Sequence, residues 1–361
     1  MSDSDALKKI RDRIDQIDAE IQGLISARAE CARNVAEVKE RSDDDAVFYR
    51  PERESAVLQR VLDRNNGPLA DEEIARLFRE IMSACLALEQ PLKVAFLGPE
   101  GTFTQAAAFK HFGASIKAFA CSNINEVFRE VDGRNCKYGV VPIENSNEGV
   151  VNYTLDSLMQ STLRICGEVE IRIQQCLLAT ETELEKITKV YSHPQSLAQC
   201  RMWLEKNLPS AERIEVSSNA EAAKKVREEP GAAAVAGESA ASVYGLSLVH
   251  RNIEDNPDNI TRFLVIGDHY VPPSPADKTT LLVSASNRSG ALYKLLKSFA
   301  DHDISLTRIE SRPSKSVSWD YVFFLDIEGH EEQPEVIAAL KQLRESTDMV
   351  KILGSYPRAV L

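Results

Sequence analysis

The first 40 residues carry a hydrophobic repeat that only a long helix satisfies. Apolar side chains recur at alternating steps of three and four residues: Leu7, Ile10, Ile14, Ile17, Ile21, Leu24, then Cys31, Val35 and Val38. This spacing is a heptad seam and predicts a helix from about residue 4 to residue 40. Such a helix would be about 55 Å long, more than the diameter of a small domain. We therefore expect an intertwined dimer with a second copy of the chain.

Three cations lie on or beside this seam. Arg28 occupies the seam position after Leu24, where a charge is costly unless it meets an acidic side chain or an anionic ligand. Lys39 lies about 20° around the helix from Arg28 and about 16 Å along it, so both side chains can reach one ligand. Arg11 is about 25 Å from Arg28, so it would have to reach the site of the partner chain.

Two further helices are predicted before residue 90. Pro51 in a first turn opens one of them, and the Asn-Gly-Pro at residues 66–68 stops it. Acidic residues 71–73 open the other, and Pro91 ends it.

Residues 1–90 resemble the all-helical chorismate mutase domain, an intertwined three-helix dimer. The resemblance implies the pericyclic rearrangement of chorismate to prephenate, in which cations hold a dicarboxylate and stabilise charge on the breaking ether oxygen. It implies roles for these side chains: Arg11 from the partner chain, Arg28, Lys39, Arg53, the ligand-binding acid Glu54, Glu89, and Cys85 at the substrate.

Three positions depart from the family pattern, which has Gln at Glu89, Ser at Cys85 and Asp at Arg50. The family's Gln donates a hydrogen bond to the ether oxygen, and Glu89 can do so only when it is protonated. We therefore expect a raised pKa for Glu89 and mutase activity that falls as the pH rises through it.

Residues 91–270 alternate apolar strands with helical patterns, typical of a doubly wound α/β domain. Strands are predicted near residues 92–97, 116–120, 138–143, 163–180, 187–192, 213–216, 232–236 and 262–266. Helices are predicted near residues 105–112, 123–131, 150–160, 195–207, 219–229 and 238–244. The length and the late strand indicate two lobes around a cleft. The Gly-rich turn at residues 98–104 lacks the lysine of a nucleotide-binding loop, so we expect it to bind another anion.

Polar side chains lie at the ends of three of these strands, two after a strand and one just before the last strand, and strand ends are where α/β sheets bind ligands. They lie in the motifs PIEN (residues 142–145), SHPQ (192–195) and N-x-TRF (259–263). Each motif alone also fits an ordinary structural turn, cap or ion pair.

With the GPEGTFT turn, these motifs resemble prephenate dehydratase, whose fold is similar to two-lobed periplasmic binding proteins. The resemblance implies that prephenate loses carbon dioxide and its 4-hydroxyl to give phenylpyruvate. Thr261 would donate or position the proton, with Asn145 and Gln195 as catalytic polar partners. The expected substrate-binding residues are Thr102, Thr104, Ser192, His193, Arg262 and Phe263. Of these, Arg262 and the residues of the Gly-rich turn would hold a carboxylate.

A Pro-rich segment at residues 271–275 predicts a stiff, exposed linker to a third domain at residues 278–357. Its βαββαβ pattern predicts a ferredoxin-like α+β fold. Its motifs at residues 290–292 and 310–313 resemble the ACT domain attached to prephenate dehydratases, which binds phenylalanine. The expected effector-binding residues are Asn287, Gly290, Ala291, Leu292, Glu310, Ser311 and Arg312.

The net charge of −12 argues against nucleic-acid or membrane partners. Seven scattered cysteines, without any CxxC pair, indicate reduced thiols in a cytoplasmic protein that needs no metal or cofactor. We expect a homodimer or higher oligomer that performs both reactions under phenylalanine feedback. A non-catalytic amino-acid sensor on a binding-protein fold is the alternative, but it leaves Arg28 unexplained.

Overall fold

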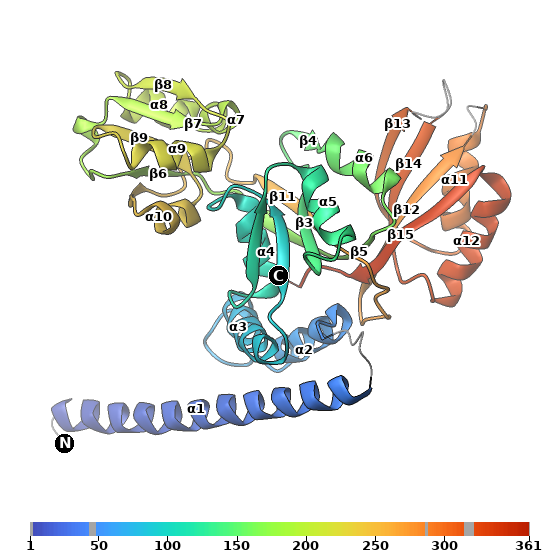
Figure 1. The fold of residues 1–361 in the computed structure, drawn as a ribbon, viewed down its shortest axis with the longest axis horizontal. Helices are drawn as coiled ribbons and strands as arrows, with labels where there is room; N and C mark the ends of the chain where they lie inside the picture. Colours follow the sequence, from blue (N-terminus) through green and yellow to red (C-terminus); the bar gives the residue numbers. More distant parts are fainter. Residues whose placement is uncertain (1–2, 43–47, 286–287, 314–320, 361) are drawn as a thin grey trace.

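Three parts follow one another along the chain in the computed structural model, which describes all residues except 1–2, 43–47, 286–287, 314–320 and 361 (Figure 1). A helical part comes first. A two-lobed α/β part follows and is built on two separate sheets. A C-terminal part with its own four-stranded sheet packs against the first of these lobes. None of the described helices is long and apolar enough to cross a membrane.

The helical part confirms the three predicted helices. They are α1 (Asp3–Ser42), α2 (Pro51–Asp63) and α3 (Asp71–Glu89). Proline at the first position of α2 and acidic residues in the first turn of α3 act as the sequence suggested. The seam of α1 is exposed over its first half, with Leu24 at 72% and Ile14 at 50% exposure. In Figure 1 this half of α1 extends away from the rest of the molecule.

The first lobe holds a mixed six-stranded sheet in the order β2-β1-β3-β11-β5, with β4 beside β3. Its elements are β1 (Lys93–Leu97), α4 (Phe103–Phe112), β2 (Lys117–Cys121), α5 (Ile124–Asp132), β3 (Tyr138–Asn145), β4 (Gly149–Val150), α6 (Asn152–Gln160), β5 (Arg164–Arg172) and β11 (Ile260–Gly267). The late strand β11 returns from the second lobe and lies antiparallel between β3 and β5. This return confirms the expected two-lobed path of the chain.

The second lobe holds the sheet β10-β6-β9-β7-β8. Its elements are β6 (Cys176–Ala179), the 3-10 turn η1 (Leu184–Lys186), β7 (Lys189–Ser192), α7 (Pro194–Gln199), α8 (Arg201–Asn207), β8 (Glu212–Glu215), α9 (Asn219–Val226), β9 (Ala232–Ala236), α10 (Glu238–Tyr244) and β10 (Ser247–His250). Three predictions were wrong in detail. The strand expected at 163–180 is interrupted where the chain passes between lobes, the helix at 195–207 breaks at Cys200, and β10 was not predicted.

The C-terminal part has the βαββαβ order that the sequence predicted. Its elements are β12 (Asp277–Ala285), α11 (Ala291–Ala300), β13 (Leu306–Pro313), β14 (Tyr321–Glu328), α12 (Pro334–Ser346) and β15 (Met349–Pro357), with sheet order β13-β14-β12-β15. One face of the sheet packs on α11 and α12. The opposite face shares a core with the first lobe, where Leu282, Phe324 and Tyr356 meet Leu264 and Ile266 of β11.

The C-terminal part packs directly on the first lobe. Val271, at the start of the expected linker, is buried, and its carbonyl accepts a hydrogen bond from His330 Nε2 at 3.0 Å. Gly354 of β15 lies against the backbone of Ile165 in β5, so closely that a side chain there would clash with the Ile165 carbonyl. The two sheets are held in direct contact. Val271 departs from the predicted exposed linker, whereas Pro273 and Pro275 are exposed as expected.

Candidate active sites

One cavity of about 670 Å³ lies among the three helices of the helical part. It is lined by six of the side chains predicted for the mutase site: Arg28, Lys39, Arg53, Glu54, Cys85 and Glu89. Arg28 and Lys39 come from one face of α1, Arg53 and Glu54 from the first turn of α2, and the last two from α3. No ion pair to Arg28 or Arg53 occurs in the part of the chain that the structure describes, so an anionic ligand fits these cations better than an internal partner.

The charges around this cavity perturb one another. Burial raises the pKa of Glu89, although Lys39, Arg28 and Arg53 oppose the rise. Burial also lowers the pKa of Lys39, and Glu89 partly offsets that change. The Lys39 ammonium lies over the ring of Phe48 at 5.0 Å from its centre. Arg11 does not line the cavity of its own chain.

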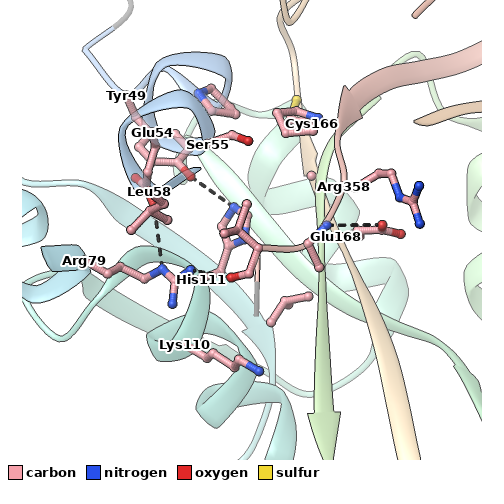
Figure 2. Close-up of a pocket in the computed structure, with 16 residues that line it drawn as sticks. Tyr49, Glu54, Ser55, Leu58, Arg79, Lys110, His111, Cys166, Glu168 and Arg358 are labelled. Carbon is pink, nitrogen blue, oxygen red and sulfur yellow. Dashed lines mark hydrogen bonds and ion pairs between the residues drawn. The ribbon is translucent and has the colours of Figure 1, made fainter. Parts of the chain in front are cut away.

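Glu54 lies between this cavity and a smaller one of about 40 Å³, where the helical part meets the first lobe and the chain end (Figure 2). Burial raises the pKa of Glu54 to about 7, against the opposing charge of Arg79. The Arg79 Nε atom lies 3.8 Å from the Glu54 carboxylate, and its Nη2 donates to the Val360 carbonyl at 3.0 Å. Tyr49 hydroxyl and His111 Nε2 are hydrogen-bonded beside them at 3.1 Å. The Glu54 carboxylate thus has a structural partner as well as a place at the larger cavity.

Asn145 and Thr261 meet at adjoining ends of strands β3 and β11. They are directly paired across the antiparallel ladder. The Asn145 Nδ2 atom donates to Thr261 Oγ1 at 2.7 Å and to Asn259 Oδ1 at 2.7 Å. The sequence motifs therefore predicted a real side-chain contact between residues 116 positions apart. Asn259, inside the N-x-TRF motif, was not assigned a role from the sequence.

The Gly-rich turn of the first lobe contacts the second lobe. The Tyr244 hydroxyl of α10 donates to the Glu100 carbonyl at 2.9 Å, and Gly101 packs against Ala240 of the same helix. Thr102 caps α4: its hydroxyl accepts the Gln105 N–H at 3.4 Å and donates to the Leu97 carbonyl. Thr104 is buried in the first turn of α4. The turn thus lies where the two lobes meet.

In the second lobe, the SHPQ motif forms the end of β7 and the start of α7. His193 caps α7, with its Nδ1 atom accepting the Gln195 N–H at 3.3 Å. Ser192 is fully buried and donates to the Val235 carbonyl at 2.7 Å. This burial contradicts the predicted substrate contact for Ser192. Among the described residues no hydrogen bond joins Gln195 to Asn145 or Thr261, so the structure leaves Gln195 in the opposite lobe.

Arg262 corrects a second prediction. Successive residues of a strand face opposite sides, so Arg262 points away from Thr261 and toward the C-terminal sheet. It is 7% exposed, and its guanidinium donates to Glu168 at 2.8 Å, Asp326 at 2.6 Å and the Tyr356 hydroxyl at 3.1 Å. These partners leave it unable to hold a substrate carboxylate. Phe263, also predicted at the substrate, is instead buried in the core of the first lobe.

The predicted effector residues divide between two places. Gly290 starts α11 with a positive φ of 81°, its surroundings are open, and Ala291 and Leu292 follow it. Ser311 is exposed on β13, with Glu310 beside it. Arg312 pairs with Asp156 of α6 at 3.0 Å, and its contact with an effector stays a prediction. Asn287 lies outside the described residues.

Two charged residues near the sites escaped the sequence reasoning. Glu52 lines the mutase cavity, one helical step from Arg53, and pairs with Arg50 at 3.7 Å. Arg79 on α3 is the partner of Glu54. Helical spacing identified α3 as a packing helix but gave no reason to bury a cation on it. In the described part of the chain no group of His, Cys, Asp and Glu side chains is arranged to hold a metal ion.

Comparison with known proteins matches each part to a family. Residues 10–90 match chorismate mutase type II, residues 94–270 match prephenate dehydratase, and residues 279–345 match the ACT domain. A bifunctional chorismate mutase/prephenate dehydratase of Pseudomonas aeruginosa is 55% identical over the full length of both chains. The bifunctional enzyme of Escherichia coli K12 is 33% identical, covering 99% of this chain and 97% of the relative.

Two solved structures match about three quarters of the chain. Prephenate dehydratase of Arthrobacter aurescens in complex with L-Phe has a TM-score of 0.68 and 36% identity, covering 75% of this chain and 93% of that one. GqqA, described as a quorum-quenching acylase, has a TM-score of 0.69 and 30% identity, covering 74% and 98%. From its full-length identity to bifunctional relatives, this chain belongs to the bifunctional chorismate mutase/prephenate dehydratase family.

Proposed function

We propose that this chain converts chorismate to prephenate in its helical part and prephenate to phenylpyruvate in its two-lobed part, with phenylalanine feedback through its C-terminal part. The observation that carries the proposal is the 55% identity to a bifunctional enzyme over the full length of both chains. An acylase function is disfavoured because that likeness is 30% identical and covers 74% of this chain, against 55% over the full length for the bifunctional relative. A non-catalytic sensor would not need a cavity lined by cations.

In the mutase reaction Arg28, Lys39 and Arg53 hold the two carboxylates of chorismate in the reactive conformation. The rearrangement needs no nucleophile, so positioning and electrostatic stabilisation account for the acceleration. Protonated Glu89 donates a hydrogen bond to the ether oxygen as charge develops there, consistent with its raised pKa. Cys85 and Glu54 contact the substrate from the same cavity.

Arg11 completes this site from a second chain in an intertwined dimer. The exposed seam of α1 supports the dimer, because an apolar stripe this long is not left in water on a stable helix. Residues 11 and 28 are about 25 Å apart on one helix, so the Arg11 that reaches this cavity comes from a second chain, and an antiparallel pairing of the two α1 helices would bring it there. The dimer thereby makes each mutase site dependent on both chains.

In the dehydratase reaction Thr261 supplies a proton or hydrogen bond to the departing 4-hydroxyl of prephenate. Aromatisation drives the loss of carbon dioxide, so assistance to the leaving group is what the enzyme must add. Asn145 holds the Thr261 hydroxyl from the neighbouring strand. The turn at residues 101–104 binds a carboxylate, and Gln195 and His193 approach from the second lobe when the lobes close. The two-lobed path of the chain supports a likeness to periplasmic binding proteins.

The C-terminal part binds phenylalanine near the start of α11, where Gly290 leaves open space for a ligand. Its sheet order supports a ferredoxin-like arrangement. Binding is communicated through contacts between the C-terminal sheet and the sheet of the first lobe. One of these contacts is the ion pair of Arg308 with Glu144, the residue next to Asn145. Six buried free cysteines fit a protein that works in the reducing cytoplasm.

One experiment tests the proposed function directly. Purified protein is given chorismate, and prephenate and then phenylpyruvate are followed, with and without millimolar phenylalanine. We expect both products in sequence and a lower dehydratase rate with phenylalanine. Formation of prephenate alone would refute the dehydratase assignment, and formation of neither would favour the sensor alternative. Equal dehydratase rates with and without phenylalanine would refute the feedback.

A further inference from the structure

The backbone fixes which way the amide of Asn145 points. Its Oδ1 atom accepts the N–H of Asn147 at 3.0 Å and the N–H of Glu148 at 3.1 Å. A backbone N–H can only donate, so the atom facing these two groups must be the amide oxygen. The Asn145 nitrogen therefore lies at the other end of the amide, toward strand β11.

This orientation determines the direction of the next two hydrogen bonds. The Asn145 Nδ2 atom donates one hydrogen to Asn259 Oδ1 and the other to Thr261 Oγ1, both at 2.7 Å. An amide nitrogen has no acceptor capacity, so Asn259 must present its oxygen and Thr261 must act as the acceptor. The hydroxyl hydrogen of Thr261 is then left to donate elsewhere.

In this arrangement the Asn259 side chain keeps an unpaired hydrogen-bond donor. Its side chain is 1% exposed, and its Nδ2 atom has no hydrogen-bond partner among the described residues. Buried amides are almost always paired at both ends, and an unpaired one in a native protein calls for an explanation. Asn259 cannot turn its nitrogen toward Asn145 without placing two donors face to face. Its oxygen is therefore held where Asn145 needs an acceptor.

The position of Asn259 in the fold is equally specific. Its carbonyl accepts the Ile173 N–H at 2.7 Å, where the chain passes from β5 toward the second lobe. Residues 259 and 261 lie on the same face of an extended segment, since side chains alternate along it. Asn259 thus joins the crossing between the lobes to the pair Asn145 and Thr261.

We infer that Asn259 is a positioning residue of the dehydratase site, which holds the Asn145 nitrogen against Thr261 so that Thr261 presents its hydroxyl hydrogen to the substrate. This inference rests on the proposed role of Thr261 as the proton donor. Without the Asn259 acceptor, the Asn145 nitrogen keeps only Thr261 and the more distant Ile260 carbonyl at 3.4 Å as acceptors. The nitrogen would then be held less firmly against Thr261, and the Thr261 hydroxyl would point less often at the leaving hydroxyl.

The test compares Asn259→Ala with Asn256→Ala, both in the full-length protein. Asn256 lies in the same loop, is exposed, and contacts Asn147 but not Asn145, so it serves as the matched control. We expect Asn259→Ala to lower dehydratase kcat about 10- to 100-fold, the scale of a misplaced reacting group, with KM changed less than about threefold. Unchanged mutase activity and an unchanged melting temperature would show that the variant is folded. A dehydratase kcat like that of the control would overturn the inference.

A double mutant separates positioning from an independent effect. If Asn259 acts through Thr261, Asn259→Ala should cause little further loss in a Thr261→Ala background. Losses that multiply would overturn the inference, because they would show that Asn259 acts elsewhere. Failure of the underlying role is visible separately: Thr261→Ala would then keep near-normal dehydratase turnover, whatever Asn259→Ala does.

Discussion

Replacing Arg262 by methionine should damage the stability of the protein more than its affinity for prephenate. Arg262 and Lys278 face Glu168 and Asp326 in a buried group with no net charge. Lys278 stays with Glu168 at 2.7 Å after the change, so the carboxylate left without a cation is that of Asp326, which is 1% exposed. Removing one partner of a buried pair costs about 3–5 kcal/mol.

The surface pair of Arg358 with Glu328 provides the matched control. Its side chains are 49% and 43% exposed and 3.0 Å apart, so Arg358→Met should cost less than about 1 kcal/mol. For a domain of this size, a loss of about 3–5 kcal/mol corresponds to a melting temperature roughly 10 °C lower. Calorimetry measures this shift, and steady-state kinetics with prephenate below the transition measures KM.

Two results would refute the reasoning. If Arg262→Met has the same melting temperature as the Arg358→Met control, the buried group does not stabilise the contact between the first lobe and the C-terminal sheet. If KM for prephenate rises by orders of magnitude while the melting temperature is unchanged, Arg262 holds the substrate and the geometric argument fails. We expect the opposite pattern, with KM changed less than about threefold in the folded enzyme.

Three other predictions concern single charges. Because burial raises the pKa of Glu89, mutase kcat should fall as the pH rises through that pKa. The variant Glu89→Gln should flatten this pH–rate profile. An unchanged profile in the variant would exclude Glu89 as the hydrogen-bond donor. The pKa of Glu54 rises from 4.5 to about 7, so the folded state keeps a proton that the unfolded chain loses. Stability should therefore fall between about pH 4.5 and 7, by on the order of 3 kcal/mol, and Glu54→Gln should remove this fall in pH-dependent melting. Arg308→Met, which removes the partner of Glu144, should raise the phenylalanine concentration for half-inhibition at least about fivefold; an unchanged value would exclude this route.

The parts of the fold that depend on local pattern were predictable from the sequence. The helices α11 and α12 begin and end where the sequence indicated, because Gly290 and Pro334 open them and apolar periodicity fills them. The heptad seam likewise predicted α1. Asn145 and Thr261 were predicted to converge because their motifs lie at strand ends, and the strands proved to be neighbours.

The prediction for Arg262 failed because its partners are remote in sequence. Glu168 and Asp326 lie 94 and 64 residues away, on two different sheets, and no sequence pattern near Arg262 indicates that they are its partners. Alternation along the strand could have shown that Arg262 and Thr261 face opposite sides. The same period places Asn259 on the side of Thr261, which is the signal that was overlooked.

Strands β3 and β11 use both of their faces, and this explains how feedback can reach the dehydratase site without a long path. Asn145 and Thr261 lie on one face, while their neighbours Glu144 and Arg262 bind Arg308 and Asp326 of the C-terminal sheet on the other. The two sheets share one core, and close-packed cores shift as units and do not deform locally. A phenylalanine-dependent shift of the C-terminal sheet must therefore move the two strands that carry Asn145 and Thr261. Because the two strands are paired at these residues, the shift would carry Asn145 and Thr261 together, keep their 2.7 Å contact, and change their position relative to the second lobe.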